Sequence, residues 1–258
     1  MDNSEIKVSE DRFVSRLHEN LIAFENAGRI QESDNLAELR KLTGGKLLRA
    51  ELEAKYPLGK TLSMRITPKA GLFAKEKRSI ILMGKVIVRL DRFVEKGSDD
   101  EPISLSELNT ILSKESDIAN RSCYESVLGL YSPTEWNNEA KAFIENNPPG
   151  SGWASNRVHP VLIGPEITQL MWDKKSSKIS NYIQCFCGLT LAERQQVCKD
   201  IIKRAILVQE FANLAKIAAE NGFSLDFVKK VGKELTSCSK ELVFSKVTGV
   251  GFVVKKKI

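Results

Sequence analysis

The stretch Phe211-ANLAKIAAENGFSLDFVKKVGKE-Leu235 carries the clearest pattern in the chain. Leu214 and Ala218 repeat at helical spacing and predict a first short helix with a small inner face. Gly222 follows, and glycine adopts the positive φ of a tight turn without strain. Ser224 is placed to cap a second helix, whose apolar stripe is Phe227, Val228, Val231 and Leu235. Two short helices joined by a glycine turn predict a helix-turn-helix.

The next stretch, Leu242-VFSKVTGVGFV-Val254, places two apolar runs on either side of a turn with two glycines. This pattern predicts a β-hairpin, and three consecutive lysines follow it. A hairpin directly after a helix-turn-helix has the position of a wing. Together the two stretches, roughly 50 residues, resemble the winged-helix family. Within them, Val247-TGVG-Phe252 is similar to the wing of response-regulator DNA-binding domains.

The winged-helix resemblance implies that the second helix enters the major groove of double-stranded DNA and that the hairpin contacts phosphate. The residues expected to face DNA are Ser224, Lys229, Lys230, Lys233, Lys246, Lys255, Lys256 and Lys257. Asp226 opposes this expectation, because its carboxylate repels phosphate unless it accepts a hydrogen bond from a cytosine amine. Helix-turn-helix proteins commonly pair half-sites, so the expected assembly is a homodimer. The alternatives are a structural helical cap with a solvated lysine face and a scaffold that docks a partner protein.

The charge distribution agrees with a nucleic-acid partner for the C-terminal region. The 258-residue chain has 39 Lys and Arg against 33 Asp and Glu. Residues 190–258 hold 13 of the basic and 7 of the acidic residues, so the remainder of the chain is neutral, with 26 of each. A basic excess confined to one module is the electrostatic pattern of nucleic-acid binding.

Three domains are expected. Residues 1–56 predict a helical N-terminal segment, with a helix over 9–27 capped by Ser9 and shorter helices over 33–42 and 46–55. Residues 57–188 predict an α/β domain with a mixed sheet, because apolar strands alternate with capped helices. Residues 189–258 form the winged helix. The strands expected in the middle domain cover 62–66, 126–131 and 158–163, and the apolar stretch 79–91 predicts a central strand or a hairpin. Its helices are expected after Ser104, after Thr134 or Ser132, and after Pro165.

The middle domain resembles the Mrr-type branch of the restriction-endonuclease-like fold. Val86-IVRLDR-Phe93 looks like the strand that bears the metal-binding motif of that family. Leu128-GLYSPTEWNNEAKAF-Ile144 is similar to the strand, turn and Glu-Ala helix of that branch, and Val161-LIGPEITQL-Met171 is similar to its closing segment. The resemblance covers about a third of the chain and implies the fold.

Active members of that family have an acidic residue on one strand, then Glu or Gln, one residue and Lys on the next strand, and the acids hold Mg²⁺. Here Arg89 takes the expected carboxylate or amide position and Asp91 takes that of Lys. We therefore expect a catalytically degenerate domain with no metal. One alternative is a Mg²⁺-dependent endonuclease that uses Asp91, Glu76 and Lys85. Another is an unrelated α/β domain in which Asp91 and Arg92 form an ion pair.

The remaining composition predicts a cytoplasmic protein without cofactors. Five cysteines, an odd number, and a polar N-terminus predict reduced thiols. With only His18 and His159 as further soft ligands, a structural zinc site is not expected. No apolar run approaches the roughly 18 residues of a membrane span, so no membrane partner is expected.

Overall fold

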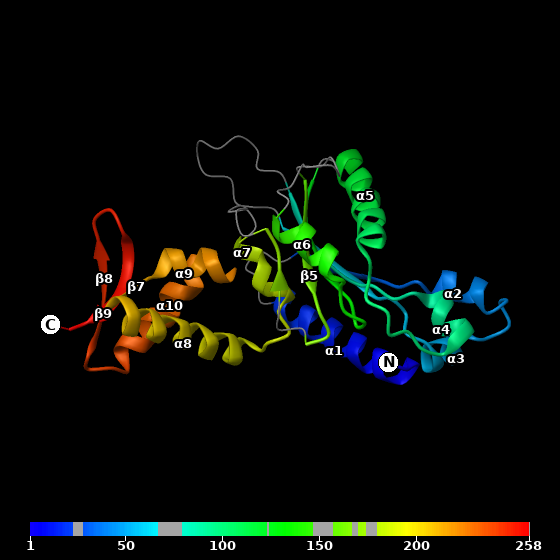
Figure 1. The fold of residues 1–258 in the computed structure, drawn as a ribbon, viewed down its shortest axis with the longest axis horizontal. Helices are drawn as coiled ribbons and strands as arrows, with labels where there is room; N and C mark the ends of the chain where they lie inside the picture. The colour runs from blue at the N-terminus through cyan, green and yellow to red at the C-terminus, as the bar shows by residue number, and fades with distance from the viewer. Residues whose placement is uncertain are drawn as a thin grey trace. The chain divides into compact units, whose positions relative to one another are not determined.

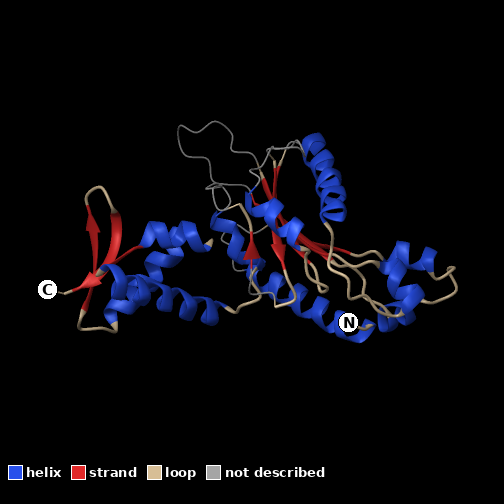
Figure 2. Cartoon of the chain, in the orientation of Figure 1, coloured by secondary structure: helices blue, strands red, loops and turns tan. Residues whose placement is uncertain are grey.

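The computed structural model describes residues 1–22, 28–66, 79–122, 124–146, 157–166, 170–173 and 180–257. The chain is mixed α/β and divides into two compact units. The first unit comprises residues 1–173 and 185–188, and the second comprises residues 174–184 and 189–258. Figures 1 and 2 show the helices and strands of each unit. Among the described residues, no helix combines the length and apolar character needed to cross a bilayer.

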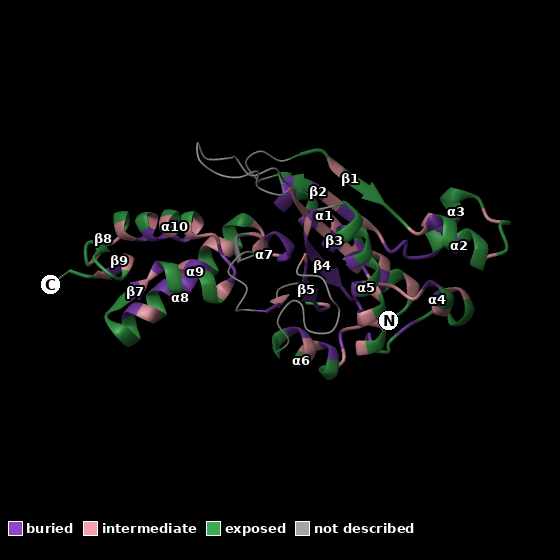
Figure 3. Ribbon diagram, turned by 90° about the horizontal axis from the view of Figure 1, so that it is seen from above, coloured by how far each residue is buried: buried purple, intermediate pink, exposed green. Residues whose placement is uncertain are grey.

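The first unit is built on a six-stranded mixed sheet with the strands in chain order, β1-β2-β3-β4-β5-β6. Strands β1, β2 and β3 pair antiparallel, β3, β4 and β5 pair parallel, and β6 is antiparallel to β5. Figure 3 shows that β4 and β5 are buried whereas the edge strand β1 is exposed. The strands are β1 (Ile30–Ser33), β2 (Thr61–Ile66), β3 (Ile80–Val86), β4 (Glu125–Tyr131), β5 (Val158–Ile163) and β6 (Leu170–Met171). Residues 1–56 belong to this unit, since β1 pairs with β2.

Helix α1 (Asn3–Ile22) covers one face of this sheet at a pair of glycines. Gly84 of β3 lies beside Gly129 of β4 in the parallel register. A Cβ at Gly84 would meet the Leu17 side chain of α1, and a Cβ at Gly129 would meet the ring of Phe186. The two glycines therefore let α1 and Phe186 approach the sheet more closely than side chains would allow.

The opposite face of the sheet is covered by α5 (Leu105–Ser122) and α6 (Asn138–Asn146). Leu108 and Leu112 of α5 pack with Leu128 and Leu130 of β4 in one buried cluster. Helix α5 begins at Ser104, as the sequence predicts. Ser104 forms a capping box with Glu107, in which the Ser104 N–H donates to the Glu107 carboxylate at 2.8 Å.

Three shorter helices of the first unit pack together beside the main core. They are α2 (Leu36–Leu42), α3 (Arg49–Lys55) and α4 (Leu90–Lys96). Leu39 and Leu52, from α2 and α3, are buried against Phe93 of α4 in a cluster separate from the main core. Helix α4 ends at Gly97, which has a φ of 74°. The predicted helices over 33–42 and 46–55 therefore start later than expected, and the residues before α2 form the edge strand β1 instead.

Several other sequence-based boundaries are wrong. Helix α1 starts at Asn3 because the Asp2 carboxylate accepts the Ser4 and Glu5 amides, so Ser9 lies inside the helix and contacts Tyr131. Asn137 is placed as the cap of α6, since its side-chain oxygen accepts the Ala140 amide. The sequence predicts Thr134 or Ser132 as this cap.

Two predicted elements change type. The stretch 79–91, predicted to be a central strand or a hairpin, contains one strand that ends at Val86, and α4 follows it. The predicted helix after Pro165 includes the two residues of strand β6, which close the sheet edge beside β5.

The second unit combines helices α7 (Ser180–Ile183), α8 (Leu191–Gln209), α9 (Leu214–Asn221) and α10 (Leu225–Ser237) with a small sheet. The sheet has the order β7-β9-β8 and is antiparallel throughout. Its strands are β7 (Phe211–Asn213), β8 (Leu242–Val247) and β9 (Gly251–Lys256). Cys198 and Ile202 of α8, Val228 and Val231 of α10, and Val254 of β9 are buried in one core. Helix α8 ends at Gln209, and Glu210, whose φ is 63°, leads into β7.

Candidate nucleic-acid interface

The turn between α9 and α10 is fixed by a glycine and a serine, as the sequence predicts. Helix α9 starts at Asn213, whose side-chain oxygen accepts the Ala215 amide at 3.0 Å. It ends at Gly222, whose φ is 67°. Ser224 then starts α10, and its hydroxyl accepts the Phe227 amide at 3.2 Å. The glycine reverses the chain and the cap sets the start of α10, so the direction of this helix follows from local sequence.

The β8–β9 hairpin packs one of its faces against α10 (Figure 1). Phe244 of β8 and Phe252 of β9 belong to that face, and their ring centroids are 5.7 Å apart. Gly232 of α10 leaves room for this approach, because a Cβ there would lie only 3.2 Å from Val254. The hairpin is therefore held beside α10 by aromatic and aliphatic contacts that a larger residue at Gly232 would disturb.

Three of the predicted DNA-facing lysines gather around these two rings. The Lys229 ammonium lies 4.7 Å from the centroid of Phe252, and the Lys246 ammonium lies 5.9 Å from the same centroid. The Lys233 ammonium lies 5.6 Å from the centroid of Phe244. Cations within about 6 Å of a ring are attracted to its face. The two rings thus hold three ammonium groups from α10 and β8 at one place.

Asp226 neutralises part of this positive charge. Its carboxylate is 3.1 Å from the Lys229 ammonium, and its side chain is 92% exposed. The contact joins residues three apart on α10, and exposed pairs of this kind are weak, roughly 0.3–0.5 kcal/mol. An arriving phosphate therefore has little to displace, and Asp226 is less of an obstacle than its charge alone indicates.

The other predicted contacts lie elsewhere on the unit. Lys230 is exposed on α10 but is not among the lysines that rest on Phe244 and Phe252. Lys255 pairs with Phe211 and Val243 on the sheet face that points away from α10. Lys256 and Lys257 follow at the open end of the hairpin, about 13 Å along β9 from Phe252 at 3.3 Å per residue. These lysines therefore lie apart from Lys229, Lys233 and Lys246, and the eight predicted residues cannot all contact DNA in the same way.

Phe244 and Phe252 were not singled out from the sequence as part of the site. The signal that could have found them is the period-2 alternation of the hairpin. In an antiparallel pair Phe252 lies directly opposite Lys246, and Phe244 shares the face of Lys246 because the two are two residues apart. The hairpin turn itself, Thr248 to Val250, carries no charged residue.

The candidate nuclease residues of the first unit are not assembled as the alternative required. Lys85 is on β3, and the carboxylate beside it is that of Glu115 on α5, at 3.3 Å. Asp91 is exposed in the first turn of α4, and Glu76 lies outside the described residues. Lys85 and Asp91 therefore belong to different elements, and Glu115, which sequence reasoning did not select, is the partner of Lys85.

Arg89 has a structural role. It precedes α4, and its Nε is 2.9 Å from a carboxylate oxygen of buried Asp99. Arg92 also binds Asp99, at 3.2 Å, and Glu101, at 2.6 Å. The Asp91–Arg92 ion pair belonged to the alternative of an unrelated α/β domain, and the partners of Arg92 are instead Asp99 and Glu101. These two arginines join the start of α4 to the loop before α5, which explains why basic residues follow an apolar strand here.

Comparison of the chain with protein-family models, with curated proteins and with solved structures finds no match.

Proposed function

We propose that the chain binds double-stranded DNA through its second unit, with α10 in the major groove and the β8–β9 hairpin beside it. The observation that carries this proposal is the cluster of Lys229, Lys233 and Lys246 on Phe244 and Phe252. The rings restrict the long lysine side chains, so less conformational entropy is lost when the ammonium groups meet phosphates.

The order of elements supports this reading. A helix, a short strand, a helix-turn-helix and a hairpin follow one another, and β7 completes the sheet of the hairpin. This is consistent with the winged-helix resemblance. The major groove is about 12 Å wide and admits one helix. Lys230 and Lys233 are exposed on α10, where a helix in the groove would present them to DNA.

We propose further that the first unit is a restriction-endonuclease-like domain that does not cut DNA. In active members of the family, the acidic residue and the Glu-x-Lys motif lie on neighbouring strands. In this chain β2 and β3 are antiparallel neighbours. Arg89 and Asp91, which take the motif positions in the sequence, lie beyond the end of β3. On β3 itself, Met83 stands two residues before Lys85, and β2, TLSMRI, has no acidic residue. Glu115 is already bound to Lys85. These residues do not fit Mg²⁺, which prefers carboxylate oxygens.

The test is fluorescence anisotropy of the full chain on duplex DNA over a salt series. We expect log affinity to fall linearly with log salt, with a slope of about −0.9 per phosphate neutralised. Lys229→Ala with Lys233→Ala should weaken binding and reduce the slope by about two. Lys41→Ala with Lys96→Ala removes the same charge from exposed positions of the first unit and should leave the slope unchanged.

Each result has a distinct meaning. The number of chains per duplex at saturation tests the proposed homodimer. If the full chain shows no salt-sensitive DNA affinity, or if both double variants lose it equally, the lysine cluster is not the DNA site. Metal-dependent nicking of a plasmid that Lys85→Ala abolishes would contradict a non-cutting first unit.

A further inference from the structure

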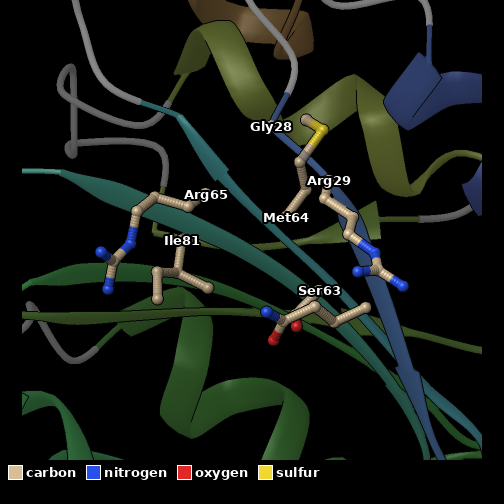
Figure 4. A pocket seen from close by; sticks show the side chains of 7 residues that line it. Gly28, Arg29, Ser63, Met64, Arg65 and Ile81 are labelled. Atoms are coloured by element: carbon tan, nitrogen blue, oxygen red, sulfur yellow. The ribbon is translucent and has the colours of Figure 1, made fainter.

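A pocket of about 570 Å³ opens on the first unit at the exposed edge of the six-stranded sheet. It is lined by Arg29, Gln31, Ser63, Arg65 and Ile81, together with Gly28 and Met64 (Figure 4). Ile81 also packs on the core beneath α5 and α6, so the pocket lies on the face opposite α1. Strand β1 is the edge strand, and the lining residues Arg29, Gln31 and Arg65 are exposed.

The alternation of the strands selects polar residues for this face. Gln31 lies opposite Ser63 in the β1–β2 register, and Arg65 lies opposite Ile81 in the β2–β3 register. Glu32 is one residue from Gln31 and so faces the other side of the sheet. Among the described residues that line the pocket none is acidic, and the polar ones all offer hydrogen-bond donors.

Arg29 and Arg65 differ from the arginines that stabilise this unit. Arg89 and Arg92 each bind Asp99 in an ion pair. Within the part of the chain that the structure describes, neither Arg29 nor Arg65 is joined to a carboxylate in this way. Figure 4 shows their side chains on either side of Ser63 and Ile81. Two guanidinium groups that form no ion pair with a described carboxylate thus line the same pocket.

The donor set indicates the chemistry of the ligand. Guanidinium groups bind phosphate and carboxylate through paired hydrogen bonds, and the Ser63 hydroxyl and Gln31 amide add donors for the same kind of oxygen. The apolar surface of Ile81 suits an organic part of the ligand. A volume of 570 Å³ is in the range of roughly 300–1,000 Å³ found for small-molecule sites.

We infer that this pocket binds an organic phosphate of nucleotide size, held by Arg29 and Arg65 across Ser63 and Ile81. The site uses none of the residues of the proposed DNA interface and lies in the other compact unit. The first unit, which we propose does not cut DNA, would then have a role in binding a small molecule.

The experiment is isothermal titration calorimetry of the full chain with ADP, AMP and adenosine. We expect ADP or AMP to bind with a Kd below about 1 mM and adenosine to give no heat, because it lacks the phosphate. Arg29→Gln and Arg65→Gln each remove one charge-assisted contact and should weaken binding about tenfold or more. Arg40→Gln on exposed α2 is the matched control and should bind as the wild type does.

A second variant keeps both guanidinium groups. Ser63→Phe fills the pocket with a large side chain and should abolish nucleotide binding while DNA binding is retained.

The inference is overturned if neither nucleotide binds at about 1 mM, or if binding survives both arginine variants. It is also overturned if a short DNA duplex displaces ADP and loses its own affinity in Arg65→Gln, since the pocket would then be a nucleic-acid contact. Lys229→Ala with Lys233→Ala should leave ADP binding intact, so failure here and failure of the DNA proposal are separable.

Discussion

Glu10 is a single buried carboxylate that joins α1 to the segment entering β2. Its side chain is 1% exposed. One carboxylate oxygen accepts the Leu58 amide at 2.9 Å and the other accepts the Lys60 amide at 2.6 Å. Burial disfavours the charged form, while these two amides favour it. The burial is the larger influence, and the pKa of Glu10 is raised above its ordinary value of 4.5.

This raised pKa predicts how stability depends on pH. The native chain binds more protons than the unfolded chain from the ordinary value of 4.5 upward to the raised pKa. As the pH falls from neutral through that window, the wild type should therefore gain stability relative to Glu10→Gln, which does not titrate. Urea unfolding of both proteins at a series of pH values measures the difference. A difference that does not change with pH, or that moves the other way, would show that burial is not the dominant influence on Glu10.

At the scale of elements, Ser224 has two roles that substitutions can separate. Its hydroxyl caps α10 by accepting the Phe227 amide, and its position at the start of α10 makes it a proposed DNA contact. Ser224→Ala removes the cap and should lower the free energy of unfolding by about 1 kcal/mol. Ser224→Asp keeps a good cap but adds a carboxylate where phosphate is expected.

We therefore expect Ser224→Asp to retain nearly wild-type stability while binding DNA more weakly than Ser224→Ala does. Urea unfolding and DNA anisotropy on the same preparations test this. If Ser224→Asp binds DNA as well as Ser224→Ala, the start of α10 does not approach phosphate. If both variants are equally destabilised, the serine hydroxyl is not acting through its cap.

Elements set by local chemistry were predictable from sequence, and elements set by distant partners were not. The Ser104 and Ser224 caps and the β8–β9 hairpin depend on neighbours along the chain, and the structure contains them. Strand β1, IQES, is too short and polar to predict, because it is defined by pairing with β2 some 30 residues later. The sequence does not predict that β3 ends at Val86. Arg89 and Arg92 form ion pairs with Asp99, and the apolar residues before them do not indicate this contact.

The site shows the same division. The sequence offers the lysines of α10 and the hairpin as candidate DNA contacts, but it does not show that Lys229, Lys233 and Lys246 lie over the rings of Phe244 and Phe252. Their position over the rings depends on how the hairpin packs on α10, where a Cβ at Gly232 would make a tight contact with Val254. The edge pocket was likewise not predicted, since Arg29 and Arg65 are far apart in sequence and meet only through the β1–β2 pairing.

At the scale of the whole molecule, the two proposed ligand sites belong to different compact units. The basic excess of the chain lies in residues 190–258, while the pocket depends on two arginines of the first unit. The simplest arrangement is therefore one unit that holds DNA and one that holds a phosphorylated small molecule, each with its own residues.

This separation predicts additivity. Combining Arg65→Gln with Lys229→Ala and Lys233→Ala should change DNA affinity as the lysine variants do and ADP affinity as the arginine variant does. Substitutions at distant sites without shared partners add to within about 0.3–0.5 kcal/mol. The full set of variants, titrated with DNA in the presence and absence of ADP, gives the coupling free energy. A coupling free energy above about 1 kcal/mol, roughly fivefold in affinity, would mean that ADP bound to the first unit changes the DNA affinity of the second. The two sites would then be allosterically coupled.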